Sequence, residues 1–199
     1  MKIKFVISFL FYSIIFSQND TSLVLLKNID STIVTDVRYA TTNNFMGKVL
    51  YTSDKVMIRK IVADSLANAN NYFKKNFNLR IKIFDGYRPL SVQKLMWEVM
   101  PDDRYVANPV KGSRHNRGAA IDITLVDSLG NQLEMGTEYD NFTKKAHPNY
   151  KFLPKKVRAN RKLLSNVIKK FGFHPITSEW WHFDFQGWRR FSILDIIFE

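Results

Sequence analysis

The sequence predicts an α+β fold, in which helices pack on a small, mainly antiparallel sheet. Two long segments repeat apolar residues at three- and four-residue steps, which is the period of an amphipathic helix. Three shorter segments are rich in β-branched and aromatic residues, as strands are. The chain has 199 residues, of which 45% are hydrophobic, and no linker interrupts it. This length and composition favour one packed core.

The first seventeen residues are predicted to be a signal peptide that precedes this core. Lys2 and Lys4 come before a mainly apolar run over residues 5–16, and Ser17 offers a small residue for cleavage before Gln18. The run is shorter than the roughly 20 residues that cross a bilayer comfortably. The alternatives are an uncleaved anchor and a buried first helix. We expect an exported protein, periplasmic or secreted, without stable membrane insertion after cleavage.

The next part of the chain is expected to form short apolar pieces over residues 22–39 and then a long helix. Ser53 or Asp54 can cap this helix, which continues to about Phe77 because apolar side chains recur along one face. Residues 79–84 alternate apolar and basic side chains, which predicts a strand.

The remaining elements follow from the same periods and from turn-forming residues. Pro89 suits the first turn of a helix. Gly172 ends a second long helix, which carries an apolar stripe. In order, we expect a helix over 91–100, a hairpin with strands over 119–126 and 132–135, a helix over 154–171, a strand over 180–185 and an apolar tail over 191–198 that packs on the body.

The charge and the absence of cysteine restrict the possible partners and sites. The formal charge is +12, or +10 once Lys2 and Lys4 are removed with the signal. Basic residues occur as separated pairs rather than as an aromatic-interleaved stripe, so we expect a solvated basic surface and no nucleic-acid partner. Without cysteine there is no disulfide, and any metal must be held by His, Asp or Glu.

Two stretches hold the residues best suited to catalysis: one runs from Ser113 to Asp122, and the other is Glu179-Trp-Trp-His182. Hydrolytic zinc sites use three N or O ligands and leave one position for water. His115, Asp122 and His182 make such a set. Glu179 is then placed to take a proton from the water. The pattern therefore indicates a metallohydrolase.

Local structure supports this grouping, although each residue also has a structural alternative. Asp122 lies between two isoleucines in a predicted strand, so its carboxylate points away from the face that they bury. His182 alternates in the same way with Trp181 and Phe183. Gly118 allows a sharp turn after His115. Taken alone, however, a histidine near aromatic rings is often only a packed, hydrogen-bonded residue.

The spacing Ser113-x-His115-x-x-Gly118-x-Ala120-x-Asp122, followed by Glu179-x-x-His182, resembles the D-Ala-D-Ala metallopeptidases, a family of zinc D,D-carboxypeptidases and dipeptidases. Supporting matches are Asp85-Gly-Tyr-Arg-Pro89, Met135-Gly-Thr137 and Gln186-Gly-Trp188. The longer stretches look most like the dipeptidase branch, and they are Gly112–Gly118, Ala120–Leu125 and Glu179–Phe183. The resemblance runs from about residue 30 to the C-terminus. It implies a hedgehog-like fold with the zinc site at the sheet, and residues 18–199 as a single zinc peptidase domain.

The resemblance also implies the roles of the site residues. His115, Asp122 and His182 bind one Zn²⁺ per chain, and Glu179 is the general base and acid. Arg88 helps to stabilise the transition state, because a fixed guanidinium favours the charge that grows on the attacked carbonyl oxygen.

Three of the candidate residues keep alternatives. Arg88 can instead form a structural ion pair with Asp85 or another acid. The resemblance places Ser113 and Asp140 near the amino end of the substrate, yet Asp140 can also be a solvated loop residue. His147 and His174 match no ligand position.

The expected function is therefore hydrolysis of D-alanyl-D-alanine, or a closely related D-amino-acid dipeptide, in peptidoglycan turnover. One alternative is a D,D-carboxypeptidase or endopeptidase that acts on longer peptidoglycan peptides. The other is a non-catalytic wall-binding module. The vancomycin-resistance enzyme that typifies the dipeptidase branch acts in the cytoplasm, whereas this chain carries an apparent export signal. A role in scavenging or trimming wall-derived dipeptides is thus favoured over antibiotic resistance.

Overall fold

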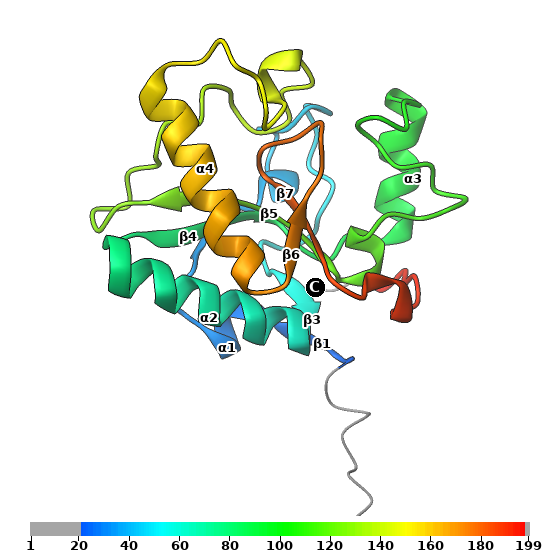
Figure 1. Ribbon diagram of the computed structural model, residues 1–199. Helices are drawn as coiled ribbons and strands as arrows, with labels where there is room; N and C mark the ends of the chain where they lie inside the picture. Colours follow the sequence, from blue (N-terminus) through cyan, green and yellow to red (C-terminus); the bar gives the residue numbers. More distant parts are fainter. Residues whose placement is uncertain (1–20, 198–199) are drawn as a thin grey trace, which may run out of the picture.

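The structure of the protein, a computed structural model, describes residues 21–197 and is built on a five-stranded sheet in the order β2-β4-β5-β7-β6 (Figure 1). The strands are β2 (Val34–Thr35), β4 (Arg80–Asp85), β5 (Ala120–Val126), β6 (Phe173–Pro175) and β7 (His182–Phe185). β2 is parallel to β4, and the other neighbouring pairs are antiparallel. The predicted α+β class with a mainly antiparallel sheet is confirmed. The predicted signal peptide lies outside the described residues.

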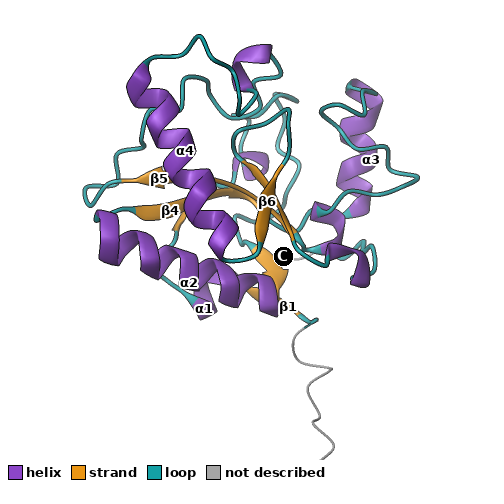
Figure 2. Cartoon of the chain, viewed as in Figure 1, coloured by secondary structure: helices purple, strands orange, loops and turns teal. Residues whose placement is uncertain are grey.

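Two long helices pack beside this sheet, and a third stands apart. α2 (Lys60–Phe77) contacts β4, α4 (Lys155–Lys170) contacts β6, and the two helices contact each other. α3 (Leu90–Val99) lies at the other side of the molecule (Figures 1 and 2). The predicted helical stripes are the buried faces: Val62, Leu66, Ala69 and Phe73 in α2, and Val157, Leu164, Val167 and Ile168 in α4. Burial of each large apolar side chain contributes about 1.5–3 kcal/mol.

The start of α2 differs from the prediction. The helix does not begin near Ser53 or Asp54, because residues Met57–Arg59 form strand β3, which pairs antiparallel with β1 (Leu23–Leu25). α1 (Leu26–Ile29) follows β1 directly. β1 and β3 form a two-stranded ribbon, and Ile58 is fully buried in this ribbon rather than in the helical stripe. Strand pairing with a distant segment therefore overrides the local helical pattern.

Other expected elements are present with altered bounds. The strand over 79–84 is β4, the helix over 91–100 is α3, and the second long helix is α4, which stops before Gly172 at φ +84°. The return strand over 132–135 is reduced to one bridge between Val126 and Gln132. β6 was not predicted. The start of the apolar tail packs on the body as expected, since Leu194 N–H donates to Asn116 O and Phe191 is buried, but Ile196 and Ile197 are exposed.

Within residues 21–197, none of the helices combines the length and the apolar character that a membrane span requires.

Candidate metal centre

Three adjacent strands place a row of polar side chains at the centre of the sheet. Asp122 of β5 lies opposite Asp85 of β4 on one side and opposite His182 of β7 on the other. The pairing of β4 with β5 shifts register between Ile83 and Asp85, and such bulges re-aim side chains beside functional sites. All three polar residues are buried, so their charges must be matched within the protein.

The register of β5 and β7 brings Asp122 and His182 into direct contact. The backbone hydrogen bond next to this pair joins Ile123 N–H, which follows Asp122, to Trp181 O, which precedes His182. Asp122 and His182 are therefore a non-hydrogen-bonded pair of the antiparallel ladder. In such a pair the side chains on neighbouring strands lie closest together. Asp122 Oδ1 lies 3.0 Å from His182 Nδ1.

The third residue, His115, comes from the short turn His115–Arg117 that precedes β5. Gly118 makes this approach possible for two reasons. Its φ is +63°, a conformation that disfavours residues with a Cβ. A Cβ at Gly118 would also lie 2.8 Å from Leu23 Cδ2 and 3.3 Å from Arg59 N. The predicted need for glycine after His115 is therefore confirmed, with the β1–β3 ribbon as a second cause.

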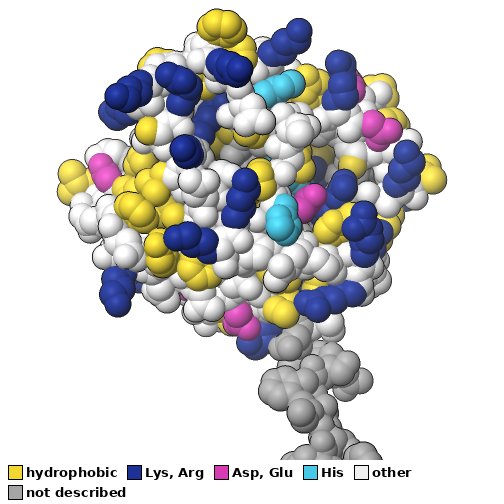
Figure 3. Space-filling view, in the orientation of Figure 1, with side chains coloured by type: hydrophobic (Ala, Val, Ile, Leu, Met, Phe, Trp, Pro, Cys, Tyr) yellow, Lys and Arg dark blue, Asp and Glu magenta, His cyan; other side chains and the backbone are white. Residues whose placement is uncertain are grey.

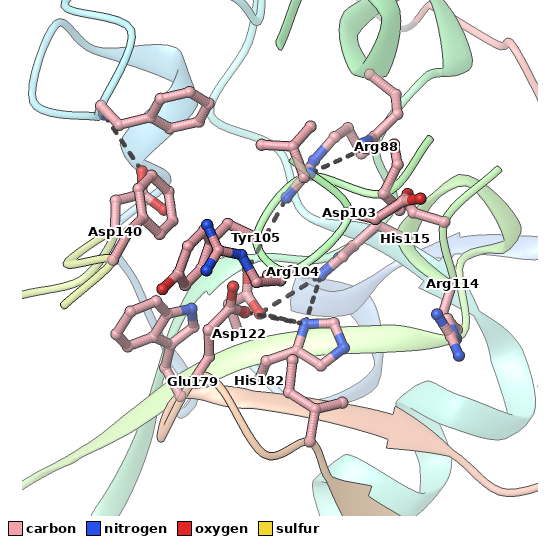
Figure 4. Close-up of a pocket in the computed structure, with 18 of the residues that line it drawn as sticks. Arg88, Asp103, Arg104, Tyr105, Arg114, His115, Asp122, Asp140, Glu179 and His182 are labelled. Carbon is pink, nitrogen blue, oxygen red and sulfur yellow. Dashed lines mark hydrogen bonds and ion pairs between the residues drawn. The ribbon is translucent and has the colours of Figure 1, made fainter. Parts of the chain in front are cut away.

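His115, Asp122 and His182 form one buried cluster, as predicted (Figure 4). His115 Nε2 lies 3.1 Å from His182 Nδ1 and 3.4 Å from Asp122 Oδ1. In this cluster two ring nitrogens and one carboxylate oxygen face each other. Among residues 21–197, these three are the group of His, Asp and Glu side chains that could hold a metal ion.

The outer partners of the two histidines decide which ring nitrogens carry protons. His115 Nδ1 is 2.7 Å from Gly86 O, and a carbonyl oxygen can only accept, so Nδ1–H donates to it. His182 Nε2 is 2.9 Å from Asp184 Oδ1 and donates to that carboxylate. In the neutral histidines, the ring nitrogens that face Asp122, His115 Nε2 and His182 Nδ1, then carry lone pairs. Carboxylate and carbonyl partners of this kind are usual behind metal-binding histidines.

The distances within the cluster fit a tetrahedral metal ion. Zinc with ligands at about 2.0–2.1 Å keeps neighbouring ligand atoms about 3.3–3.4 Å apart. The three distances here are 3.0, 3.1 and 3.4 Å. Two lone pairs and a carboxylate oxygen repel each other unless a cation lies between them. The donor set and its spacing therefore fit a divalent metal, in line with the metal site that was predicted at the sheet.

The electrostatics of the cluster also favour a cation. Burial opposes charge on His182, but its hydrogen bonds with Asp122 and Asp184 raise its pKa to about 10. Burial likewise opposes charge on Asp122, yet the neighbouring histidines hold the pKa of Asp122 far below its usual range. In the metal-free protein, a proton on His182 therefore supplies part of the positive charge that a bound metal would supply.

Glu179 lies beside this cluster, where the sequence placed it. Its Oε2 is 4.0 Å from His182 Nδ1, and its side chain is buried in the same cavity. Burial raises the pKa of Glu179 to about 8, with Asp122 and Asp140 adding to the rise and His182 opposing it. A carboxyl group with a pKa near neutrality exchanges a proton readily, which suits a general base.

Arg88 forms the structural ion pair that the sequence left open, and it does so inside the same cavity. Its Nε and Nη2 donate to Asp85 Oδ2 at 3.0 and 2.6 Å, so the structural ion pair exists. Its Nη1 donates to Gln93 Oε1, and Nη2 is 3.9 Å from Asp122 Oδ2. Burial opposes its charge, but Asp85 keeps the pKa of Arg88 above its usual value. The ion pair therefore holds a charged guanidinium in the cavity beside the metal ligands.

Ser113 and Asp140 both line this cavity, but their contacts differ. The Ser113 hydroxyl accepts from Asn116 N–H at 3.2 Å, and Asn116 Oδ1 accepts from Ser113 N–H, so Ser113 also fixes the turn. Asp140 accepts from Tyr39 O–H at 3.1 Å and from Phe45 N–H at 3.3 Å. Burial raises the pKa of Asp140 to about 7. Asp140 lies in a loop and is half-buried, and its carboxylate is held by these two partners.

The cavity that contains these groups is small, about 100 Å³. One wall is aromatic, since the ring centroid of Phe142 lies 5.3 Å from that of Phe45 and 5.0 Å from that of Tyr105. Trp181 also lines the cavity, whereas neither His147 nor His174 does. Figure 4 shows Asp140 at one end of the cavity and His115 with His182 at the other.

Two supporting residues were missed at the sequence level. Asp184 holds His182, and Tyr139 O–H donates to Asp122 Oδ2 at 2.9 Å, which orients the carboxylate. Asp184 had a signal, because residues two apart in a strand share a face and His182-x-Asp184 has that spacing. Tyr139 had none, since it approaches from a loop with no regular period.

A family model and two relatives in sequence carry the same description. The family model described as D-ala-D-ala dipeptidase, of peptidase M15, matches residues 19–191. Over 164 residues the chain is 35% identical to the D-alanyl-D-alanine dipeptidase of Escherichia coli (strain K12), covering 82% of this chain and 84% of that protein. Over 169 residues it is 28% identical to the D-alanyl-D-alanine dipeptidase of Streptomyces coelicolor, covering 74% and 83%. The solved structure of the LdcB LD-carboxypeptidase is 22% identical, with a TM-score of 0.45 over 87% of this chain and 72% of that one.

Proposed function

The chain belongs to the peptidase M15 family of D-Ala-D-Ala dipeptidases, and from this premise we propose that it hydrolyses D-alanyl-D-alanine to free D-alanine with one zinc ion. The observation that carries the proposal is the convergence of two histidine lone pairs and a carboxylate oxygen within 3.0–3.4 Å. A free-standing carboxyl group, Glu179, lies 4.0 Å away from His182. A binding module has no need of that second carboxylate.

A zinc ion would be held by His115, Asp122 and His182, whose Nε2, Oδ1 and Nδ1 atoms face each other. When bound, zinc supplies Lewis acidity, which makes water more acidic and polarises a peptide carbonyl. Asp184, Gly86 and Tyr139 keep the three ligands in place from behind. Such outer contacts raise the affinity of a site because the ligands need no reordering.

Glu179 performs the proton transfers. Its carboxylate takes a proton from the attacking water and returns it to the leaving amine, which needs a group that changes charge near neutral pH. Burial provides this property by raising its pKa to about 8. Arg88 stabilises the negative charge that develops on the carbonyl oxygen. Because Asp85 and Gln93 both hold its guanidinium, Arg88 needs no reorganisation during the reaction.

The far end of the cavity selects a dipeptide. Asp140 is the acidic group at that end, and its carboxylate binds the free ammonium of the substrate. Ser113 also lines the cavity and is available to the amino end of the substrate. A longer peptide has an amide in place of the ammonium and would have to extend through the aromatic wall of Phe45, Phe142 and Tyr105. The small volume of the cavity supports a dipeptidase over a carboxypeptidase for longer peptidoglycan peptides.

The protein works in the bacterial envelope after export. Support comes from the basic start and the apolar run over residues 5–16, which have the layout of a cleaved signal. Its product there is free D-alanine released from wall-derived dipeptides. Sequencing the N-terminus of the protein recovered from the envelope tests this part. A chain that still begins at Met1 would contradict cleavage.

A substrate panel tests the catalytic proposal. The zinc-loaded protein is offered the four stereoisomers of Ala-Ala, N-acetyl-D-Ala-D-Ala and an acylated pentapeptide ending in D-Ala-D-Ala, with released alanine as the readout. We expect rapid cleavage of D-Ala-D-Ala and little cleavage of both N-acylated compounds, since these lack the ammonium that Asp140 binds. Preferred cleavage of the pentapeptide would support the carboxypeptidase instead, and the absence of any cleavage would support a wall-binding module.

A further inference from the structure

A second cavity, separate from the metal centre, lies along the polar side of α4. It has a volume of about 390 Å³ and is bounded by α4, by the loop over residues 148–151 and by parts of β6 and β7. Five of its lining residues are basic and none is acidic, and they are Lys151, Arg158, Arg161, Lys162 and Lys169. Figure 3 shows Lys and Arg side chains over the face that α4 crosses in Figure 1, with few acidic ones among them.

The cationic lining follows from the helical period. Arg158, Lys162 and Lys169 are four and seven residues apart, so they project from one side of α4. These three residues are exposed, and Ser165 and Asn166 between them offer further donors. Like charges on one helix face repel each other, which costs stability unless an anion neutralises them.

Arg161 is the unusual member of this group. It sits seven residues before Ile168 and three before Leu164, at a position where the buried stripe of α4 would ordinarily continue with an apolar residue. Its side chain is only 5% exposed. Nε donates to Met135 O at 2.7 Å and Nη1 donates to His147 O at 3.0 Å. Nη2 is buried and has no hydrogen-bond partner among the described residues.

The charge of Arg161 is also unmatched. The ring of Trp180 lies 5.8 Å from its guanidinium carbon, and its other contacts are neutral carbonyls. Burial alone lowers the pKa of Arg161 to about 10, with no acidic group acting against it. Burial of an unpaired charge is costly, and a guanidinium forms strong paired hydrogen bonds with carboxylate and phosphate oxygens.

We infer that the cavity on α4 is an oxyanion-binding site, in which Arg161 holds a phosphate or carboxylate group and Arg158, Lys162 and Lys169 surround it. The site lies next to the catalytic machinery, because Arg161 touches Trp180, the neighbour of Glu179. Arg161 also holds Met135, which begins the loop that carries Tyr139 and Asp140. An anion bound at Arg161 would brace this loop.

A titration of the zinc-loaded protein tests the inference. Inorganic phosphate and succinate are added separately at constant ionic strength, and the indole N–H signal of Trp180 is followed by NMR. We expect a saturable shift with at least one of the two anions, and the stronger of them identifies the preferred group. A linear drift with both anions, without saturation, would overturn the site and indicate non-specific screening.

Matched variants locate the binding. Arg158→Gln/Lys162→Gln removes two charges from the cavity, and Lys155→Gln/Lys156→Gln removes two from the same helix outside it. We expect the first pair to weaken binding by about tenfold or more and the second by less than about twofold, as charge-assisted contacts differ from general screening. Equal weakening by both pairs would overturn the assignment. Arg161→Lys keeps the charge but loses the planar guanidinium with its paired N–H donors. It should also weaken phosphate binding while near-UV circular dichroism stays unchanged.

Discussion

Three carboxyl groups of the site have different properties because their surroundings differ. Asp122 stays ionised since two histidines and Tyr139 contact it, whereas burial raises the pKa values of Glu179 and Asp140 to about 8 and about 7. The carboxylate of Asp122 is therefore suited to hold a metal, and that of Glu179 to transfer protons. Separation of pKa values between neighbouring acids is how one site performs different acid–base tasks.

Replacing Glu179 with Gln tests its assigned role. Gln keeps the size of the side chain but cannot take a proton, so we expect kcat for D-Ala-D-Ala to fall by about 10²–10⁴-fold, the usual contribution of a general base. Zinc content should stay at one ion per chain, because Glu179 is not among the three clustered ligands. Glu98→Gln, at an exposed position on α3, is the control and should leave kcat unchanged. Near-normal turnover in the Glu179 variant would mean that another group is the base.

Asp184 is expected to act through His182 rather than on the substrate. In Asp184→Asn the His182 Nε2–H keeps an acceptor but loses the carboxylate that makes the ring more basic. We expect zinc affinity, measured by competition with a chelator, to fall by about 10–100-fold. At saturating zinc, KM should change little. Asp54→Asn, at an exposed position, is the control. A large rise in KM with unchanged zinc affinity would instead place Asp184 at the substrate.

The pH dependence of kcat/KM should report Asp140. Its ionised form binds the substrate ammonium, and its pKa of about 7 in the metal-free protein means that ionisation rises with pH through neutrality. The base Glu179, with a pKa of about 8, must also be ionised, and bound zinc, being positive, lowers both pKa values, so the two groups share an acidic limb at or below about 8. The α-amino group of the substrate loses its charge near pH 8, which sets the basic limb.

The variant Asp140→Asn separates this effect from the titration of other groups. We expect KM for D-Ala-D-Ala to rise at pH 7.5. Cleavage of N-acetyl-D-Ala-D-Ala, which has no ammonium, should be unaffected by the substitution. If the acidic limb remained unchanged in Asp140→Asn, the limb would belong to a different group.

At the scale of single residues, the cluster of His115, Asp122 and His182 with Glu179 beside it could be predicted, because each residue occurs in a short stretch with a fixed spacing. Of the supporting residues, Asp184 could have been found from its spacing to His182, but Tyr139 and Gly86 could not, because their partners are distant in sequence. Tyr139 reaches Asp122 from a loop, and Gly86 reaches His115 through a carbonyl that every residue has. The position of Arg88, paired with Asp85 and 3.9 Å from Asp122, also needed coordinates.

At the scale of elements, the turn between His115 and β5 depends on the β1–β3 ribbon behind it. Gly118→Ala adds a Cβ that meets Leu23 Cδ2 at 2.8 Å, at a backbone φ of +63°. Gly47 has a similar φ of +62° but open space around it. We expect Gly47→Ala to cost about 1–2 kcal/mol from backbone strain alone.

Gly118→Ala should cost more than that control and also disturb the metal site. We expect a larger drop in the urea midpoint, and zinc affinity lowered as His115 is displaced. The comparison uses urea unfolding for stability and chelator competition for zinc. Equal destabilisation of the two variants, with unchanged zinc affinity, would show that only the backbone conformation matters at Gly118.

The same ribbon explains where elements were predicted incorrectly. The apolar residues at 58, 61 and 62 fit a helical stripe, but residues Met57–Arg59 pair with β1, and the helix begins only at Lys60. β6 is three residues long, too short for a periodic signal, and forms because β7 offers it a free edge. Helices α3 and α4 were predicted closely, since Pro89, Pro154 and Gly172 mark their ends locally.

At the scale of the whole molecule, the metal site joins segments that no local interaction holds together. His115 precedes β5, Asp122 lies within β5, and His182 begins β7, about sixty residues further along the chain. The chain has no disulfide to link them. Such a site is not preformed in the unfolded chain, so the free energy of metal binding adds to the free energy of unfolding.

Zinc should therefore stabilise the whole protein. At free zinc about 1,000 times its dissociation constant, mass action contributes about 4 kcal/mol, which corresponds to a rise in Tm of about 8–16 °C for a chain of this size. Excess EDTA should remove the rise. The rise should also shrink as pH falls, because the ligands must be deprotonated and the raised pKa of His182 lets a proton compete with the metal. His115→Ala is the critical control: if it showed the same zinc-dependent rise, the stabilising ion would lie elsewhere, for example at the exposed His174, rather than at the sheet.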